Sequence, residues 1–364
     1  MKIFLLLAVF SSTFLMSQNK YTYSIPSKIN DGWDTEDIMT KTSDATLLYR
    51  LFNQLNNGKH KLHSTLIVKD DKIILEEYFD KNTIETKHDM RSATKSVISI
   101  AIGIAIDKGI IASIDDPILK YLHDISPNKN IDKRKEKITI RHLLTMSPGL
   151  DCNDWDKQSK GQEDKVYKKN NWLQYTLDLP VINEPGTTPL YCSMGTVLAA
   201  EVISQASGMS FEDFVNMYLF TPLGIKNVHW GHTSKRKEII SSAKRLYMTS
   251  RDMAKIGKLI VQNGQWNSNQ IVSQQWIENS TAIHTKLKGI EYGFLWWKIP
   301  FKVAQNKIMA TIASGNGGQY IMIFKELNMI AVFTGGAYNS QEGKLPYAIV
   351  NDIYLPTFVN TKNN

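Results

Sequence analysis

The chain of 364 residues contains only two cysteines, Cys152 and Cys192. The only intramolecular disulfide that it can form joins these two, and the alternative of two free thiols stays open because Cα atoms more than about 7 Å apart cannot be bridged. The eight histidines form only loose pairs, with no carboxylate or cysteine at ligand spacing, so we expect no metal and no cofactor. The sequence also lacks G-x-S-x-G and G-x-x-x-x-G-K motifs, which excludes an α/β-hydrolase elbow and a P-loop.

The net charge of +8 is spread along the chain, and only two short basic clusters occur, at 133–135 and 235–237. A glutamate follows each cluster, which favours solvated loops over a nucleic-acid contact. No aromatic-interleaved basic motif supports a nucleic-acid role, so we expect no nucleic-acid partner.

No apolar run is long enough for a clean membrane span, which needs about 20 residues. Met1-Lys2 and the apolar run from Ile3 to Met16, broken by Ser11, Ser12 and Thr13, have the layout of a signal peptide. We predict a signal peptide over residues 1–17 and export to the periplasm or beyond, with no stable membrane anchor after signal removal.

Patterns of short strands stand at both ends of the chain. Residues 64–68 and 73–78 predict one hairpin, turning at Asp70-Asp71, and residues 319–324 and 329–334 predict a second. A helix is predicted near 43–56, and helical periodicity dominates the middle of the chain. We therefore predict an α+β fold, an α/β sandwich whose antiparallel sheet comes from both termini and is flanked by helices. Residues 18–109 and 234–364 would form this α/β domain, and residues 110–233 a mostly α-helical domain.

The pattern S-x-x-K occurs five times, but only Ser92 opens a segment, 97–106, that is apolar on every side. Such a helix must be buried. Lys95 lies one turn after Ser92 on the same face, and burial together with the helix N-terminus would lower the pKa of its amine toward that of a general base. The alternative is an ordinary N-cap serine followed by a surface lysine.

The segment Met90–Ser96 resembles the nucleophile motif of the β-lactamase-related serine hydrolases. Further segments resemble this family in the same order, so that the likeness covers nearly the whole mature chain: 115–117, 141–150, 184–187 and 221–225. The resemblance implies a β-lactamase/transpeptidase-like fold, with Ser92 as nucleophile, Lys95 as base and the Ser92 N–H as one oxyanion donor.

The family's second motif, Y-x-N or Y-x-S, is matched by Tyr191-Cys192-Ser193, 99 residues after the nucleophile (191 minus 92). The resemblance implies that Tyr191 is a proton relay, and an ammonium group beside it would favour the phenolate. Ser193 would support the network of Lys95 and Tyr191. Residues 338–340 also fit the bare pattern, but they follow the last hairpin.

The third motif, K-T-G or H-x-G, is matched only in part by residues 313–319. Gly315 would permit close substrate approach, and the N–H of Asn316 would be the second oxyanion donor. Ala313 stands where the family has a cation that holds a substrate carboxylate, which argues against penicillin-like ligands. The spacing is most similar to the branch that contains 6-aminohexanoate-dimer hydrolase and related esterases.

The sequence therefore predicts an exported serine hydrolase that cleaves a small-molecule ester or amide through an acyl-enzyme at Ser92. A D-amino-acid peptidase, carboxypeptidase or β-lactamase acting on cell-wall-type substrates is the alternative, and a catalytically silent binding protein is another. The oligomeric state stays open. Several tryptophans are candidates for an acyl pocket, although core packing is the commoner role of such residues: Trp155, Trp172, Trp230, Trp296 and Trp297.

Overall fold

One sheet of nine strands runs through the computed structural model, which describes residues 20–231 and 245–359. Its order is β1-β3-β2-β14-β13-β12-β11-β10-β9, and all neighbours are antiparallel except β1 and β3. The bounds are β1 Asp34–Thr35, β2 Leu62–Lys69, β3 Lys72–Tyr78, β9 Thr285–Leu287, β10 Ile290–Tyr292, β11 Trp297–Val303, β12 Asn306–Gly315, β13 Gln319–Phe324 and β14 Met329–Gly335. Because β2 pairs with β14, the two ends of the chain meet inside this sheet.

Both predicted hairpins are present. Asp70 and Asp71, between β2 and β3, have φ values of 48° and 68°, the left-handed conformation that a tight two-residue hairpin turn requires. Between β13 and β14 a 3-10 turn over Lys325–Leu327 ends at Asn328, which also has a positive φ of 45°. Asparagine and aspartate tolerate this conformation better than most residues.

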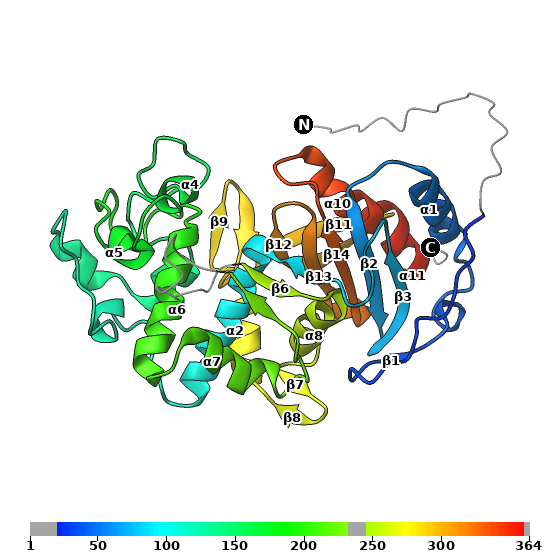
Figure 1. Ribbon diagram of the computed structural model, residues 1–364, viewed down its shortest axis with the longest axis horizontal. Coiled ribbons are helices and arrows are strands. Elements are labelled where there is room, and N and C mark those ends of the chain that lie inside the picture. Colours follow the sequence, from blue (N-terminus) through cyan, green and yellow to red (C-terminus); the bar gives the residue numbers. More distant parts are fainter. Residues whose placement is uncertain (1–19, 232–244, 360–364) are drawn as a thin grey trace.

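Helices cover both faces of the sheet (Figure 1). One face packs against α1 (Thr46–Asn57) and the C-terminal helices α10 (Leu345–Ile349) and α11 (Leu355–Phe358), and the other against α2 (Thr94–Asp107) and α8 (Ser250–Val261). Successive residues of β14 alternate between these two cores, as the pleat of a strand requires. The predicted α+β class, with a sheet drawn from both termini and flanked by helices, is confirmed.

The middle of the chain is mostly helical and lies at the left of Figure 1, where α6 packs on α2. Its helices are α3 (Ile140–Leu144), α4 (Glu163–Val166), α5 (Trp172–Leu177), α6 (Ser193–Ser207) and α7 (Phe211–Val215). Short β5 (His229–Trp230) pairs with β6 (Leu246–Met248), which pairs with β4 (His88–Asp89). The remaining elements are β7 (Gln265–Trp266), β8 (Asn269–Gln270) and α9 (Gln274–Thr281). The division into two domains stays a prediction, as does the signal peptide, which lies outside the described residues.

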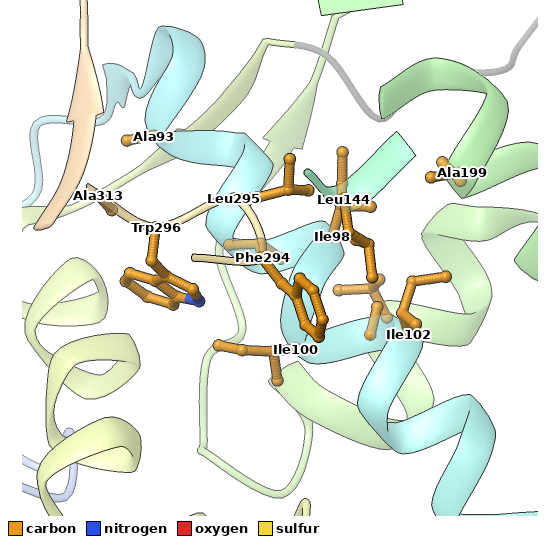
Figure 2. Packing of buried hydrophobic residues seen from close by; sticks show 14 of the residues in the cluster. Ala93, Ile98, Ile100, Ile102, Leu144, Ala199, Phe294, Leu295, Trp296 and Ala313 are labelled. Carbon is orange, nitrogen blue, oxygen red and sulfur yellow. The ribbon is translucent and has the colours of Figure 1, made fainter. Parts of the chain in front are cut away.

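The helix α2 passes through the centre of the molecule, and every residue from Thr94 to Ala105 is buried. Figure 2 shows isoleucines that leave it on several sides, with Leu144, Ala199, Phe294 and Trp296 around it. Burying one such isoleucine is worth about 1.5–3 kcal/mol. The apolar sequence of this helix therefore fixes the depth at which its first turn, including Lys95, sits in the protein.

One basic residue departs from the sequence prediction. Lys135, in the cluster expected to be a solvated loop, is only 3% exposed. Its ammonium group donates to the carbonyls of Leu177, at 2.6 Å, and Lys129, at 3.1 Å, and these bonds compensate the burial. The second cluster, 235–237, lies outside the described residues.

Within residues 20–231 and 245–359, none of the helices combines the length and the apolar character that crossing a bilayer requires.

Candidate active site

The nucleophile candidate Ser92 lies in a 3-10 turn, Arg91–Ala93, that leads directly into α2. It precedes the α-helix and does not form its first residue, a small correction to the predicted helix start. The Lys95 Nζ atom lies 2.8 Å from Ser92 Oγ, and Lys95 is only 4% exposed. The alternative of an N-cap serine with a surface lysine is therefore wrong for this pair.

Arg91 holds the turn in an unusual backbone conformation, with a φ of 51°. A non-glycine residue in this region is strained and persists only where its surroundings hold it. The Arg91 N–H donates to Asp89 Oδ1 at 2.9 Å, its Nε lies 3.2 Å from Asp89 Oδ2, and its guanidinium lies 4.6 Å from the centre of the Tyr338 ring. These contacts fix the bend that presents Ser92.

The structure brings Tyr191 to the same place from the residues just before α6. Its side chain is hydrogen-bonded with Ser92, and Lys95 Nζ lies 5.0 Å from the centre of its ring. Burial raises the pKa of Tyr191 well above its usual range, and the hydrogen bond with Ser92 only partly opposes this effect. This shift is opposite in direction to the expected preference for the phenolate, and it favours the neutral phenol.

The loop after Cys152 holds Tyr191 in position. The Asp154 N–H donates to the Tyr191 carbonyl at 2.8 Å, and Asp154 Oδ2 accepts the backbone N–H of Ser193 at 2.9 Å. A disulfide joins Cys152 to Cys192, with 5.2 Å between their Cα atoms. The backbone from the Tyr191 carbonyl to Ser193 is thus bound to one segment about 40 residues earlier.

Two of the candidate tryptophans cover the Tyr191 ring. Trp155 stacks on it with ring centres 4.9 Å apart and planes only 3° apart, and Trp297 lies at 5.9 Å. Trp155 is 42% exposed, and Lys288 Nζ lies 4.7 Å from the centre of its ring. The other three candidates, Trp172, Trp230 and Trp296, are buried in the core.

No hydrogen bond of the Ser193 side chain supports the role predicted for it. Its side chain is fully buried, but its Oγ has no hydrogen-bond partner among the residues that the structure describes. Only its backbone N–H takes part, through Asp154. A sequence motif gives the spacing of its members but not the rotamer of each.

Gly315 has a structural reason to be small. A Cβ atom here would lie 2.1 Å from the Met90 carbonyl oxygen, so any side chain would push β12 away from the turn that holds Ser92. Asn316 follows at the end of β12, and its side-chain amide donates to Asn339 Oδ1 at 2.7 Å while its Oδ1 accepts the Asn339 N–H at 2.9 Å. The oxyanion roles of the Ser92 and Asn316 N–H groups stay predictions.

A cavity of about 40 Å³ lies beside Ser92 and is large enough for a water molecule. Its lining combines the predicted Ser92, Lys95 and Asn316 with residues that sequence reasoning missed: Arg91, Thr94, Glu163, Tyr167, Thr196 and Arg245. Glu163 and Tyr167 come from α4 and its C-cap, and the Tyr167 hydroxyl donates to Glu163 Oε2 at 3.0 Å. No spacing in the sequence links Glu163 and Tyr167 to Ser92, because only the fold of the helical region brings them to the cavity.

A larger cavity, of about 470 Å³, shares no lining residue with this site. Its buried cations are already paired, Arg251 with Glu76 and Asp31, and Lys255 with Asp252. The two pairs of Arg251 tie α8 to the N-terminal segment and to β3, whereas the pair of Lys255 lies within α8. Across the described residues, no group of three or more His, Cys, Asp or Glu side chains is placed to hold a metal ion.

A serine, a lysine and a tyrosine that meet at the start of a buried helix, beside a largely antiparallel sheet, define the serine-hydrolase class with a penicillin-binding-protein-like fold. The family model described as Beta-lactamase matches residues 57–349, and the chain belongs to this family.

Three similar proteins illustrate the range of the family. An uncharacterized protein of Alkalihalophilus pseudofirmus is 24% identical over 77% of this chain and 85% of its own length. The 6-aminohexanoate-dimer hydrolase of Paenarthrobacter ureafaciens is 20% identical, with 71% of this chain and 68% of that protein covered. A solved structure titled as a putative 6-aminohexanoate-dimer hydrolase from Bacillus anthracis has a TM-score of 0.67 at 20% identity and covers 82% of this chain and 79% of its own. At this identity the structural likeness shows a shared fold.

Proposed function

We propose that the protein is an exported serine hydrolase that cleaves an ester or amide bond in a small molecule through an acyl-enzyme at Ser92. The observation that carries this proposal is the distance of 2.8 Å between Lys95 Nζ and Ser92 Oγ, at a site where the same Nζ atom lies 5.0 Å from the centre of the Tyr191 ring. Membership of the β-lactamase family supports it.

In the first step Ser92 Oγ attacks the substrate carbonyl, and Lys95 takes the hydroxyl proton. Because burial favours the neutral phenol, Tyr191 acts as a neutral relay, passing its hydroxyl proton to the leaving group while it receives one from Lys95. Water then attacks the acyl-enzyme and releases the acid, and the same groups carry the protons in reverse. The N–H groups of Ser92 and Asn316 would stabilise the oxyanion in both steps.

A test is the variant Ser92→Ala, assayed with a panel of p-nitrophenyl esters and D-amino-acid amides. We expect the wild type to turn over at least one of them and the variant to lose activity by about 10³-fold or more, because no acyl-enzyme can form. A fluorophosphonate probe should modify the wild type at Ser92, and mass spectrometry of the labelled peptide identifies the site. Persistent hydrolysis by a folded Ser92→Ala variant would refute the assignment.

The same assays separate the two alternatives. A D-amino-acid peptidase, carboxypeptidase or β-lactamase should be labelled by a fluorescent penicillin or cleave nitrocefin, which the alanine at position 313 argues against. A silent binding protein should resist the fluorophosphonate probe. Export is tested by the N-terminal sequence of the protein recovered from the periplasm or medium, which we expect to begin near Gln18 or Asn19.

A further inference from the structure

Arg245 lines the cavity beside Ser92, and its backbone has a φ of 58°. This left-handed conformation favours glycine, and an arginine there is strained. Strain of this kind persists where the surrounding structure holds the residue, and it gathers at sites of function. Arg245 is therefore a candidate for a functional role at the cavity beside Ser92.

The neighbouring strand end is shaped to accept the Arg245 side chain. Gly231 donates its N–H to the Arg245 carbonyl at 3.0 Å, which closes the pairing of β5 with β6. A Cβ atom on Gly231 would lie 2.8 Å from Arg245 Cβ and 3.1 Å from its Cδ. The missing side chain at Gly231 therefore leaves room for the aliphatic part of Arg245 beside the cavity.

Arg245 forms no ion pair with a described carboxylate, although Glu163 lines the same cavity. Arg91, the other arginine of the cavity, forms an ion pair with Asp89, but Arg245 forms no salt bridge with any described carboxylate. Its guanidinium lies 5.9 Å from the centre of the Tyr167 ring, and the residue is exposed.

We propose that Arg245 is a specificity-determining residue that binds a carboxylate carried by the substrate, so that the preferred substrates are anionic esters or amides. A guanidinium is planar and binds a carboxylate through two parallel hydrogen bonds. Arg245 directly precedes β6 and lines the cavity from that side. This inference rests on the proposed hydrolysis at Ser92 and adds the chemical class of its substrate.

The experiment compares two pairs of substrates that differ only in charge. Mono-p-nitrophenyl adipate and p-nitrophenyl adipamate place the carboxylate or its neutral amide on the acyl side. The second pair, 4-acetoxybenzoate and 4-acetoxybenzamide, places it on the leaving group. The readout is the ratio of kcat/KM for the anionic member to that for the neutral member of each pair.

For the wild type we expect a ratio of about 10–100 in at least one pair, since a hydrogen-bonded charge pair contributes on this scale. Arg245→Gln should reduce that ratio to near one, and Arg245→Lys, which keeps the charge but loses the paired hydrogen bonds, should give an intermediate value. The matched control is Lys169→Ala, which removes an exposed positive charge that lies over Tyr175, outside the cavity lining, and should leave the ratio unchanged.

A wild-type ratio near one in both pairs, a ratio that Arg245→Gln leaves unchanged, or an equal effect of Lys169→Ala overturns the role of Arg245. These outcomes leave the proposed function intact if the neutral esters are still hydrolysed through Ser92. If the wild type turns over none of the four substrates and Ser92 is not labelled by a fluorophosphonate, the proposed function fails and the inference fails with it.

Discussion

The segment at the start of α2 and the segment just before α6 each supply part of the site, and different interactions hold these two segments in place. Ser92 and Lys95 sit on consecutive turns of one segment, whose position follows from the burial of the apolar helix behind it. Tyr191 stands just before α6 and is fixed by the Cys152–Cys192 disulfide, by Asp154 and by the stacked Trp155. The α2 start therefore depends on local spacing and core packing, whereas the α6 start depends on cross-links from a distant loop.

The sharpest way to test this comparison is to remove the hydroxyl from the α6 start. Tyr191→Phe keeps the stacked ring but loses the hydrogen bond with Ser92, so kcat for an ester substrate should fall by about 10²–10⁴-fold with little change in thermal stability. Tyr175→Phe, whose hydroxyl bonds only to the Lys160 carbonyl, is the control and should retain activity. An unchanged kcat in Tyr191→Phe would leave Ser92 and Lys95 as the whole proton-transfer machinery.

Removing the cross-link is the next step. The double variant Cys152→Ser/Cys192→Ser opens a loop with a sequence separation of 40, and we expect the free energy of unfolding to fall by about 2–4 kcal/mol. Urea denaturation with and without reductant measures this, and reductant should affect the wild type but not the variant. Equal stability of the wild type in both conditions would show that Asp154 and the aromatic stack suffice to hold Tyr191.

The segment at the start of α2 should be sensitive to substitution of Gly315, which lies against it at the end of β12. Gly315→Ala places a methyl group against the Met90 carbonyl, and we expect a loss of about 1–3 kcal/mol in stability together with lower kcat, because the Ser92 turn must shift. Gly195→Ala, in the first turn of α6, is the matched change, since its Cβ would meet nothing closer than 3.6 Å. That variant should be as stable as the wild type or more so. Similar losses in both would argue against a special constraint at Gly315.

The smallest expected effect is on the pH dependence of stability, and it comes from His88 in β4, the strand that precedes the Ser92 turn. Burial and the neighbouring His63 lower the pKa of His88 from 6.5 to about 4. The unfolded state therefore binds more protons between these values, so the stabilisation is present above about pH 6.5 and is lost as pH falls toward 4. We expect His88 to account for a loss of about 1–2 kcal/mol between pH 7 and pH 5 in denaturant titrations.

The control for this pH effect compares two glutamine variants. His88→Gln should flatten the dependence of stability on pH whatever its stability at pH 7, whereas His123→Gln, at an exposed position, should not. An unchanged slope in His88→Gln would mean that other groups titrate in this range.

Much of the fold could be predicted from the sequence because period-2 and helical patterns indicate which face of an element is buried. The two hairpins were found in this way, and so was the all-round apolar α2. Lys135 shows the limit of such patterns, since one of the two backbone carbonyls that satisfy its buried ammonium group, that of Leu177, comes from a separate segment. Nothing in the local sequence encodes those partners.

For the site, the sequence alone determined the pairing of Ser92 with Lys95, because residues three apart at a helix start share a face in any fold that buries the helix. Only the tertiary structure decided that Glu163, Tyr167 and Arg245 reach the same cavity, that the Ser193 Oγ has no hydrogen-bond partner among the described residues, and that burial raises the pKa of Tyr191. The physical reason is that burial and long-range contacts depend on the packing of the whole chain, so the local spacing of residues does not determine either.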